Sequence, residues 1–501
     1  MQKLVSALAD PIRKVRFTGE GNQFLSGADL IEVASELANL LVDRNVSCAA
    51  IRMDNGIDWV CADLACMMAG IPLVPLPFFF TPSQTAHAAA ESGIDALIGT
   101  SIGAESVFEG FKSEPASVPL QLGPTQDRVT PAGTAKLTFT SGTTGTPKGV
   151  CLSADHQLAV AQSLASATEF LNIKRHLSVL PLPILLENVA GVYAALLSGA
   201  SVCLPSLAET GVSGSSGFDP SVLLTTLRRY QPDSMILLPQ MLKSLVQHLR
   251  AKGERLDGLK LVAVGGARSA PELIHAARAI GIPAYEGYGL TECSSVVAFN
   301  LPGSDKPGSV GRSLPHQAIR ISDSGEIEVR DEHKFTYLGQ PANQSQWLAT
   351  GDLGETDVEG FLFVRGRRKQ VLITAFGRNV SPEWVESELL AGSEIAQVMV
   401  LGDGLPGLGA LIVPFSEVTT LQLKLAVERC NARLPDYARV IAFRTVDAFS
   451  QTNQQLTANG RIRREVVLAT HSTAVQSLID QIESDFSGVT DDLLQGTIAS
   501  N

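Results

Sequence analysis

A strand that runs into a loop rich in glycine and hydroxyl residues is the feature that most limits how this chain can fold. The segment KLTFTSGTTGTPKGV spans residues 136–150, and KLTFT predicts the strand. The glycines after it let the backbone turn tightly and bring its amides close to phosphate oxygens. The hydroxyls can donate hydrogen bonds to the same oxygens, and Lys148 supplies a positive charge. The segment therefore predicts a phosphate-binding loop.

Spacing argues against two better-known glycine loops. The Walker loop of kinases and GTPases needs a lysine between Gly and Ser or Thr, but Lys148 follows Pro147 and precedes Gly149. A P-loop phosphotransferase is therefore disfavoured. The run GDGLPG (402–407) fits the dinucleotide fingerprint, yet the residues after it predict another strand rather than a helix. We expect a hairpin turn there.

Short apolar runs alternate with helical stretches, which predicts an α/β architecture. Residues 49–53 predict a strand, a helical stretch follows near 57–69, and 71–76 predict the next strand. Residues 259–266 predict a strand that precedes another helix. The segment VSGSSG (212–217) predicts a surface loop or flexible connection.

A smaller C-terminal domain is expected after about residue 366, where basic residues cluster and short strand-like runs follow. The length of 501 residues also favours two to four domains or subdomains. Arg365 and Arg368 are expected in a solvated basic turn. The apolar stretch from Trp59 to Phe80 contains Asp63 and three prolines, so it predicts a buried helix and strand rather than a membrane span.

The composition argues against several classes of protein. A net charge of −12 and a pI of about 5.2 argue against nonspecific nucleic-acid binding. The seven cysteines are irregularly spaced without CxxC, and the eight histidines show no metal spacing, so neither a disulfide framework nor a zinc site is expected. The N-terminus does not resemble a signal peptide. We therefore expect a cytoplasmic protein.

The loop at 136–150 resembles the phosphate loop of the adenylate-forming superfamily, which includes acyl-CoA synthetases, adenylation domains of peptide synthetases and luciferases. Further motifs follow in that family's order from about residue 25 to about 465. The resemblance implies a large N-terminal domain of α/β layers with a small β-barrel part (residues 1–368). It also implies a mobile α+β C-terminal domain (369–501) that turns about a hinge near Lys369.

The segment EGYGLTECS (286–294) resembles the family's adenine and metal motif. Tyr288 offers a flat face for the adenine ring, and Thr291 can hydrogen-bond the α-phosphate. Glu292 is a hard oxygen ligand suited to Mg²⁺ on ATP. The preceding GGARSAPEL (265–273) resembles the glycine pair that lines the adenine and acyl pocket.

Two later segments resemble the ribose and hinge motifs. In TGDLG, Asp352 can accept hydrogen bonds from both ribose hydroxyls. In GRRKQVLITAFGRNVSPEWVE (366–386), the resemblance gives Arg367 a second ribose contact, makes Lys369 the hinge and sets Gly377 beside the pantetheine tunnel of CoA ligases.

Together these motifs define the candidate site. The expected catalytic residues are Lys148, Thr291, Glu292 and Arg461, and Glu292 is also the expected metal ligand. The expected nucleotide- and acceptor-binding residues are Thr140, Ser141, Gly142, Thr143, Thr144, Gly145, Gly266, Ala267, Tyr288, Gly289, Asp352, Arg367, Lys369 and Gly377.

The chain departs from the family pattern in two places. The last motif normally ends in Asn-Gly-Lys, and here LTANGRIRRE carries Arg461, which keeps the charge but as a planar fork. We hypothesise that Arg461 bridges the carboxylate and α-phosphate; the alternative is a slow or altered first half-reaction. In VLPLPILLENVAG, Pro183 and Ile184 stand where relatives carry His or an aromatic residue. Whether Glu187 and Asn188 form the polar face of a helix stays open.

The resemblance implies ATP- and Mg²⁺-dependent activation of a carboxylic acid to an acyl-adenylate, with pyrophosphate release and then transfer to CoA. A carrier-protein phosphopantetheine supplied in trans is the next acceptor, and an amine the third. A catalytically weak sensor of acyl-adenylate or AMP is the non-enzyme alternative. The mostly apolar pocket candidates favour a fatty or aryl acid over an amino acid, and the oligomeric state stays open. Cys293 is expected to be a half-buried thiol with no catalytic role.

Overall fold

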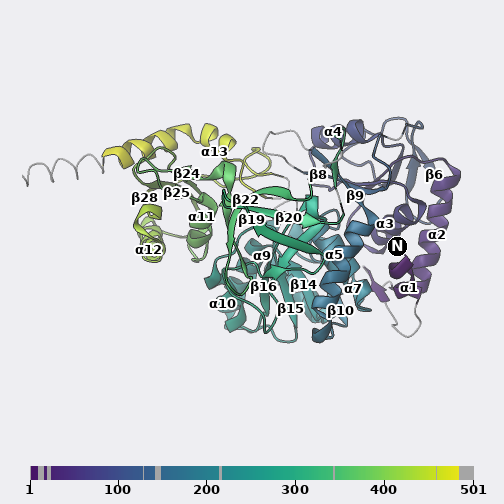
Figure 1. Cartoon of the computed structure of the whole chain (residues 1–501), viewed down its shortest axis with the longest axis horizontal. Helices are drawn as coiled ribbons and strands as arrows, with labels where there is room; N and C mark the ends of the chain where they lie inside the picture. The colour runs from purple at the N-terminus through teal and green to yellow at the C-terminus, as the bar shows by residue number, and fades with distance from the viewer. Residues whose placement is uncertain are drawn as a thin grey trace, which may run out of the picture.

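The computed structural model describes residues 2–9, 16–19, 24–127, 129–140, 148–213, 217–333, 335–341, 345–457 and 460–484. Figure 1 shows the N-terminal elements at one end of an elongated molecule and the last helices at the opposite end. The larger part is built on two wide sheets, and the smaller part contains the elements that follow β23 (Leu362–Arg367).

The first wide sheet contains the strand that enters the glycine loop. Its central strands pair in parallel and are wholly buried, as the apolar run at 49–53 predicts, while its edge strands pair antiparallel. Its order is β21 (Thr336–Tyr337), β9 (Lys148–Ser153), β8 (Thr134–Thr140), β4 (Leu73–Pro75), β3 (Ala49–Arg52), β5 (Ala96–Gly99), β7 (Leu120–Leu122) and β6 (Lys112–Glu114).

The second wide sheet contains the strand of the adenine and metal motif. Its strands β14 to β16 pair in parallel, and β16 then turns back on β17. Its order is β18 (Arg312–Ser313), β17 (Ser295–Phe299), β16 (Ala284–Leu290), β15 (Leu261–Val264), β14 (Ser234–Leu237), β10 (Arg175–Leu177), β11 (Ser201–Cys203), β1 (Arg16–Thr18) and β2 (Phe24–Ser26).

Helices cover both sheets and fill the space between them, so the large domain has alternating α and β layers. The central layer contains α1 (Gln2–Ala9), α2 (Gly27–Asp43), α3 (Ile57–Ala69), α5 (Ala154–Ala167), the π-helix η3 (Asn188–Tyr193) and α7 (Ala194–Leu197). The outer helices are α4 (Pro82–Ser92), α8 (Pro220–Tyr230), α9 (Pro239–Lys252) and α10 (Pro271–Ala279). Single turns are η2 (Glu169–Leu171), α6 (Leu185–Glu187) and η4 (Thr291–Cys293).

A four-stranded antiparallel sheet stands where the small barrel part was expected. Its order is β19 (Gln317–Ile321), β20 (Glu326–Asp331), β22 (Leu348–Thr356) and β23 (Leu362–Arg367). These strands form an open half-barrel, since the order does not close on itself. The large α/β domain and the smaller C-terminal domain are confirmed.

The C-terminal domain has separate hydrophobic cores of its own. A three-stranded sheet, β26 (Ile395–Leu401), β27 (Leu408–Pro414) and β28 (Val440–Thr445), packs against its helices, and Figure 1 shows these elements together at one end. The other elements are η5 (Arg368–Gln370), β24 (Leu372–Ile373), β25 (Asn379–Val380), α11 (Pro382–Leu390), α12 (Thr420–Asn431), η6 (Asp436–Ala438), α13 (Arg464–Thr470) and a helix over 472–484.

Several local expectations are confirmed. The helix near 57–69 is α3, the strand at 136–140 ends β8, and the dinucleotide-like run at 402–407 joins the antiparallel strands β26 and β27. The stretch from Trp59 is buried as α3 and β4. Within the described ranges no helix is long and apolar enough to cross a membrane.

Two local expectations are corrected. The segment at 212–217 is not only a loop, because β12 (Val212–Ser213) and β13 (Gly217–Phe218) pair antiparallel. Arg365 lies on the strand β23 rather than in a turn, and its exposed side chain pairs with Glu355. Arg368 does lie in a turn, η5, with an exposed side chain that pairs with Glu326 at 2.8 Å.

Glu187 and Asn188 do not form a polar helix face, because both are buried. Asn188 belongs to a cluster in which the Lys136 ammonium lies 2.9 Å from Asp63 Oδ1, and Tyr193 donates to Asp63 Oδ2 at 2.6 Å. Asn188 Nδ2 donates to Asp63 Oδ2 at 2.9 Å, and Lys136 donates to Asn188 Oδ1. The cluster ties β8, α3 and η3 together.

Candidate active site

A single continuous cavity of about 1720 Å³ runs along the carboxyl-terminal ends of β14 to β16 and on to the C-terminal domain. Its volume exceeds that of an ordinary small-molecule site. The large domain contributes β16, η4, β22 and β23 to its walls, and the C-terminal domain contributes residues around 457–466. The site is therefore shared between two domains.

Three of the expected nucleotide-binding residues meet on one wall. Asp352 on β22 is buried, and its Oδ1 pairs with Arg367 Nε on β23 at 2.7 Å. Tyr288 on β16 donates its hydroxyl to Asp352 Oδ2 at 2.6 Å. Burial raises the pKa of Asp352 above its ordinary value, although the positive charge of Arg367 opposes this shift. Each oxygen keeps lone pairs, so the carboxylate can still accept hydrogen bonds from a ligand.

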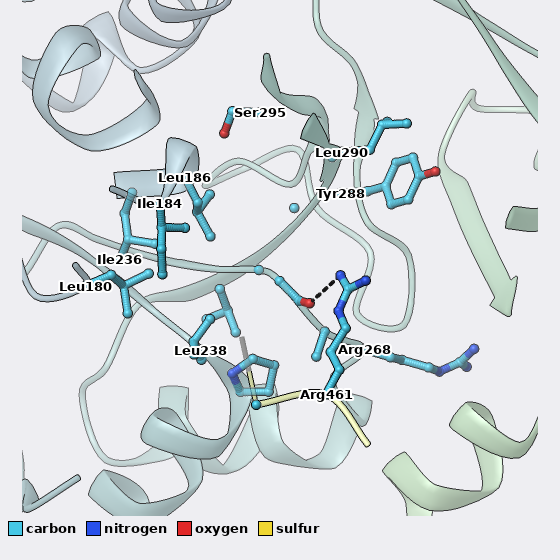
Figure 2. A pocket seen from close by; sticks show the side chains of 18 of the residues that line it. Leu180, Ile184, Leu186, Ile236, Leu238, Arg268, Tyr288, Leu290, Ser295 and Arg461 are labelled. Carbon is cyan, nitrogen blue, oxygen red and sulfur yellow. Dashed lines mark hydrogen bonds between the residues drawn. The ribbon is translucent and has the colours of Figure 1, made fainter. Parts of the chain in front are cut away.

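Arg461 reaches this wall from the C-terminal domain. Its Nη2 donates to the backbone oxygen of Gly266 at 3.1 Å, across the two domains. Figure 2 shows this contact and the Arg461 side chain pointing into the cavity beside Tyr288. Desolvation and the positive charge of Arg367 lower the pKa of Arg461, while Glu383 and Asp352 raise it. Arg461 therefore brings a positive charge from the C-terminal domain to the cavity.

Glu292 is held by a residue that the sequence analysis did not single out. Tyr337 on β21 donates its hydroxyl to Glu292 Oε1 at 2.8 Å, and the Lys148 ammonium lies 5.7 Å from the centre of the Tyr337 ring. Thr291 and Glu292 both line the cavity. One half-buried carboxylate fits the needs of Mg²⁺ on ATP, since that ion takes one or two carboxylates with phosphates and waters.

The close approach of two backbone segments explains why the segment EGYGLTECS has a glycine at position 289. A Cβ on Gly289 would lie 1.6 Å from the backbone oxygen of Ser295, where β16 and β17 pair with a register shift. Ser294 and Ser295 follow with φ angles of 55° and 129°. The turn after Glu292 is therefore strained, and only glycine fits opposite it.

An apolar wall lies across the cavity from Tyr288. Figure 2 shows Leu180, Ile184, Leu186, Ile236 and Leu238 grouped on that side. Pro183 and Ile184 line the cavity at the place where relatives carry His or an aromatic residue. Behind the wall, Glu187 is buried and pairs with His176 Nε2 at 3.1 Å.

Glu286 is a second residue that sequence reasoning missed. It lies on β16 within the quoted motif, is buried, and lines the cavity. Burial raises its pKa to about 7, partly opposed by the backbone N–H of Gly308 and the charge of Arg268. A glutamate between two glycine-rich segments was the available signal, but sequence spacing gives no measure of burial.

Other expected residues have different placements. Ser141, Gly142, Thr143, Thr144 and Gly145 lie outside the described residues, and for Thr140 only its backbone, at the end of β8 opposite Lys148, is described. Gly266, Ala267, Gly289 and Lys369 line the cavity.

Gly377 lies in an exposed turn between β24 and β25 and does not line the cavity in this arrangement. Cys293 is fully buried rather than half-buried, and burial raises its pKa well above the ordinary value. Its thiol is therefore not a nucleophile at neutral pH.

Comparisons with known proteins match this arrangement. A family model described as AMP-binding enzyme covers residues 6–334, and one described as AMP-binding enzyme C-terminal domain covers residues 369–483. A 2-succinylbenzoate–CoA ligase of Bacillus subtilis (strain 168) is 28% identical over 411 residues, which are 76% of this chain and 80% of the relative.

A long-chain-fatty-acid–CoA ligase of Mycobacterium bovis is 30% identical over 248 residues. That match spans 43% of this chain and 41% of the relative, so it covers less than half of either. A solved structure of o-succinylbenzoate CoA synthetase from Bacillus subtilis, in complex with its acyl-adenylate intermediate, has a TM-score of 0.75 and 25% identity over 92% of this chain and 97% of that chain. Because the AMP-binding model covers well over half of the residues, the chain belongs to the AMP-binding enzyme family of the adenylate-forming superfamily.

Proposed function

We propose that the chain is an ATP-dependent acid–CoA ligase, which joins a carboxylic acid to AMP, releases pyrophosphate and then transfers the acyl group to CoA. The observation that supports this most directly is the contact of Arg461 with Gly266 beside Tyr288, Asp352 and Arg367. The relatives named above are acid–CoA ligases, and one was solved with an acyl-adenylate.

In the first step, a carboxylate oxygen forms a bond to the α-phosphorus of ATP while the bond from that phosphorus to the bridging oxygen breaks. The acid is already ionised, so the protein's task is to position the reactants and balance charge. Tyr288, Asp352 and Arg367 would bind the nucleoside. Thr291 and Arg461 would bind the α-phosphate, and Lys148 the outgoing pyrophosphate.

Glu292 would be the ligand of Mg²⁺, which neutralises phosphate charge when bound. Tyr337 fixes one oxygen of this carboxylate, so the other oxygen is the one available to the ion. No cluster of three or more metal-ligating side chains exists among the described residues, which suits an ion held mainly by ATP and water.

In the second step, the thiol sulfur of CoA forms a bond to the acyl carbon, the bond from that carbon to the phosphate oxygen breaks, and AMP leaves. The thiol proton passes to solvent or to a nearby base. We propose a domain boundary at 368/369 and a hinge at Lys369. Separate hydrophobic cores on the two sides of that position support this proposal.

The decisive experiment measures pyrophosphate release with hydroxylamine as trap, MgATP and a panel of acids, followed by CoA or a carrier protein as acceptor. Acid-dependent release with AMP formation and an acyl-CoA product is expected. ADP formation, or nucleotide binding without turnover of any acid, would contradict the proposal. Transfer only to a carrier-bound phosphopantetheine would keep the first step and replace the acceptor.

Arg461→Ala is expected to reduce acyl-adenylate formation about a hundredfold, because the charge that meets the α-phosphate is lost. Thioester formation from supplied acyl-adenylate should change far less. Arg461→Lys restores the charge and is expected to recover much of the rate. Arg320→Ala, on the exposed face of β19, is the matched control. Equal losses in both steps would contradict this role for Arg461.

A further inference from the structure

The apolar wall of the cavity indicates what kind of acyl group the substrate acid has. Leu180, Ile184, Leu186, Ile236 and Leu238 approach the cavity from different elements and meet on one side of it (Figure 2). Burying an apolar group against such a surface contributes about 25 cal/mol per Å² of area removed from water. This side of the cavity therefore favours a hydrocarbon acyl group.

The two ionisable groups at this wall, His176 and Glu187, pair with each other, and of the two only His176 lines the cavity. One oxygen of Glu187 pairs with His176 Nε2, and the other accepts the backbone N–H groups of Val179 at 3.3 Å and Leu180 at 2.9 Å. The His176 Nδ1 atom lies 3.0 Å from Ser234 Oγ. Because every described atom of this set has a partner inside the protein, it offers no counter-charge to a ligand.

The positive residues of the cavity lie elsewhere. Among described residues that line it, these are Arg268, Arg367, Lys369, Arg461, Arg463 and Arg464. All but Arg268 belong to β23 or to the chain after it, and Arg268 donates to the backbone oxygen of Val364 at 2.7 Å. A second carboxylate or an amine that packs against the five wall residues themselves would therefore meet no opposite charge from them, and burying it there costs several kcal/mol.

Ser295 brings a polar group to the edge of this side. It is only 7% exposed, it lines the cavity, and its hydroxyl has no hydrogen-bond partner in the described structure. Figure 2 shows its side chain at the edge of the apolar group, near Leu186 and across from Leu290. A buried hydroxyl without a partner is rare, because it forfeits its hydrogen bonds to water.

The backbone of Ser295 has an energetically unfavourable conformation. The φ of Ser295 is 129°, a region that L-residues avoid, and the neighbouring Ser294 has a φ of 55°. Such conformations each cost about 1–3 kcal/mol and persist where the surroundings impose them. Ser295 lies where β16 and β17 pair with a register shift, and its carbonyl oxygen closely approaches Gly289. The serine is thus fixed before any ligand arrives.

Resting on the proposed ligase function, we infer that the substrate is a monocarboxylic acid with an apolar, uncharged acyl group that bears one neutral oxygen substituent. That substituent, a hydroxyl, ether or ketone, hydrogen-bonds Ser295. Ser295 is then a specificity residue, and the acid differs from both an amino acid and a dicarboxylate.

The test uses pairs of acids that differ by one oxygen. Suitable pairs are cinnamate with its ring-hydroxylated isomers, 3-phenylpropionate with its hydroxylated isomers, and octanoate with its hydroxy and oxo derivatives. Phenylalanine and 2-succinylbenzoate supply the amine and the second carboxylate. ATP–pyrophosphate exchange gives kcat/KM for each acid. The wild-type protein should favour the oxygenated member of at least one pair about tenfold, the value of one hydrogen bond.

Ser295→Ala should bring that ratio to about one by lowering kcat/KM for the oxygenated acid alone. Ser178→Ala is the matched control, because Ser178 is equally buried, its hydroxyl also lacks a partner, and it does not line the cavity. The same pairs, built as non-reactive acyl-sulfamoyl adenosines, should show the preference as a tenfold difference in Kd by calorimetry.

The outcomes separate this inference from the ligase proposal. Exchange that is equal within every pair, or greatest with phenylalanine or 2-succinylbenzoate, overturns the inference and leaves the ligase intact. A preference that survives Ser295→Ala overturns the assignment to Ser295. Absence of exchange with every acid overturns the ligase proposal itself, and the inference with it.

Discussion

Glu286 places a titratable group in the wall of the cavity, with its pKa raised from 4.5 to about 7 by burial. An acid whose pKa is raised on folding binds more protons in the folded state. Stability therefore falls as pH rises from about 4.5 to 7 and is constant above that window. The shift corresponds to about 3 kcal/mol at neutral pH and above.

Glu286→Gln should remove this pH dependence and raise the free energy of unfolding at pH 8 by about 1–3 kcal/mol, because no charge is then buried. Urea unfolding between pH 4.5 and 8 measures it. Glu328→Gln, on the solvent side of β20, is the control. A slope that persists in the Glu286 variant would contradict the assignment.

For single residues, the sequence predicted that Tyr288, Asp352 and Arg367 each bind the nucleotide, but it did not predict their contact with one another. Their direct hydrogen bonds depend on how β16, β22 and β23 meet, which no local pattern encodes. Ser295 went unnoticed for a related reason. Its interest comes from burial and a φ of 129°, and both arise from the pairing of two strands.

Among the elements, the two-residue strand β21 has an unusually large effect on the site. It pairs with β9, so that Tyr337 lies opposite Val150, two residues after Lys148. Through its hydroxyl the same strand also holds Glu292. One short edge strand thus connects the end of the phosphate loop with the expected magnesium ligand.

Tyr337→Phe keeps the ring near Lys148 but removes the hydroxyl. We expect the Kd for ATP in the presence of Mg²⁺ to rise about three- to tenfold, with little change when Mg²⁺ is absent. Calorimetric titrations with and without the ion measure this. Tyr437→Phe, exposed in the C-terminal domain, is the control. An equal change under both conditions would show that Tyr337 only supports packing.

The elements β8, α3 and η3 are connected by the cluster around the buried ion pair of Lys136 and Asp63. Lys136→Met should lower the free energy of unfolding by about 3–5 kcal/mol, because it leaves the Asp63 charge without a cation. Adding Asp63→Asn should recover most of this loss. Urea unfolding of the two single variants and the double variant gives the coupling. Additive losses would mean that the two charges do not interact.

The elements also show where sequence patterns are reliable. The helix over 57–69 was predicted with its bounds because its apolar run is bracketed by Gly56 and Gly70, which lies in the left-handed region as a helix end requires. The π-helix η3 was not predicted. Its first and last residues, Asn188 and Tyr193, both bond to Asp63, and this contact between distant segments has no signal in the local sequence.

For the whole molecule, the contact between domains contains a buried cation. Lys243 on α9 is 8% exposed, and its ammonium donates to the backbone oxygen of Ile395 on β26 at 2.6 Å. Burial lowers its pKa from 10.5 to about 8, although Glu394 opposes the shift. If the domains separate as proposed, the lysine regains its ordinary pKa. Closure then releases a proton between pH 8 and 10.5, so it becomes more favourable as pH rises through that window.

Lys243→Met should favour the closed arrangement below pH 8 and remove its pH dependence, because the cost of burying a charge, about 3 kcal/mol, disappears. The rate of proteolysis at residues 365–369, compared from pH 7 to 10, reports closure. Lys252→Met, at the exposed end of the same helix, is the control. A pH dependence identical to that of the wild-type protein would exclude Lys243 as the cause.

The position of Arg461 on the C-terminal domain also affects how long the proposed acyl-adenylate survives. An acyl phosphate exposed to solvent is lost to hydrolysis, so its lifetime depends on when it is made. In the mechanism proposed above, the guanidinium that binds the α-phosphate belongs to the same domain that closes over the cavity. On that proposal, adenylate formation and exclusion of water would begin with the same closure, and an open cavity would bind acid and ATP without joining them.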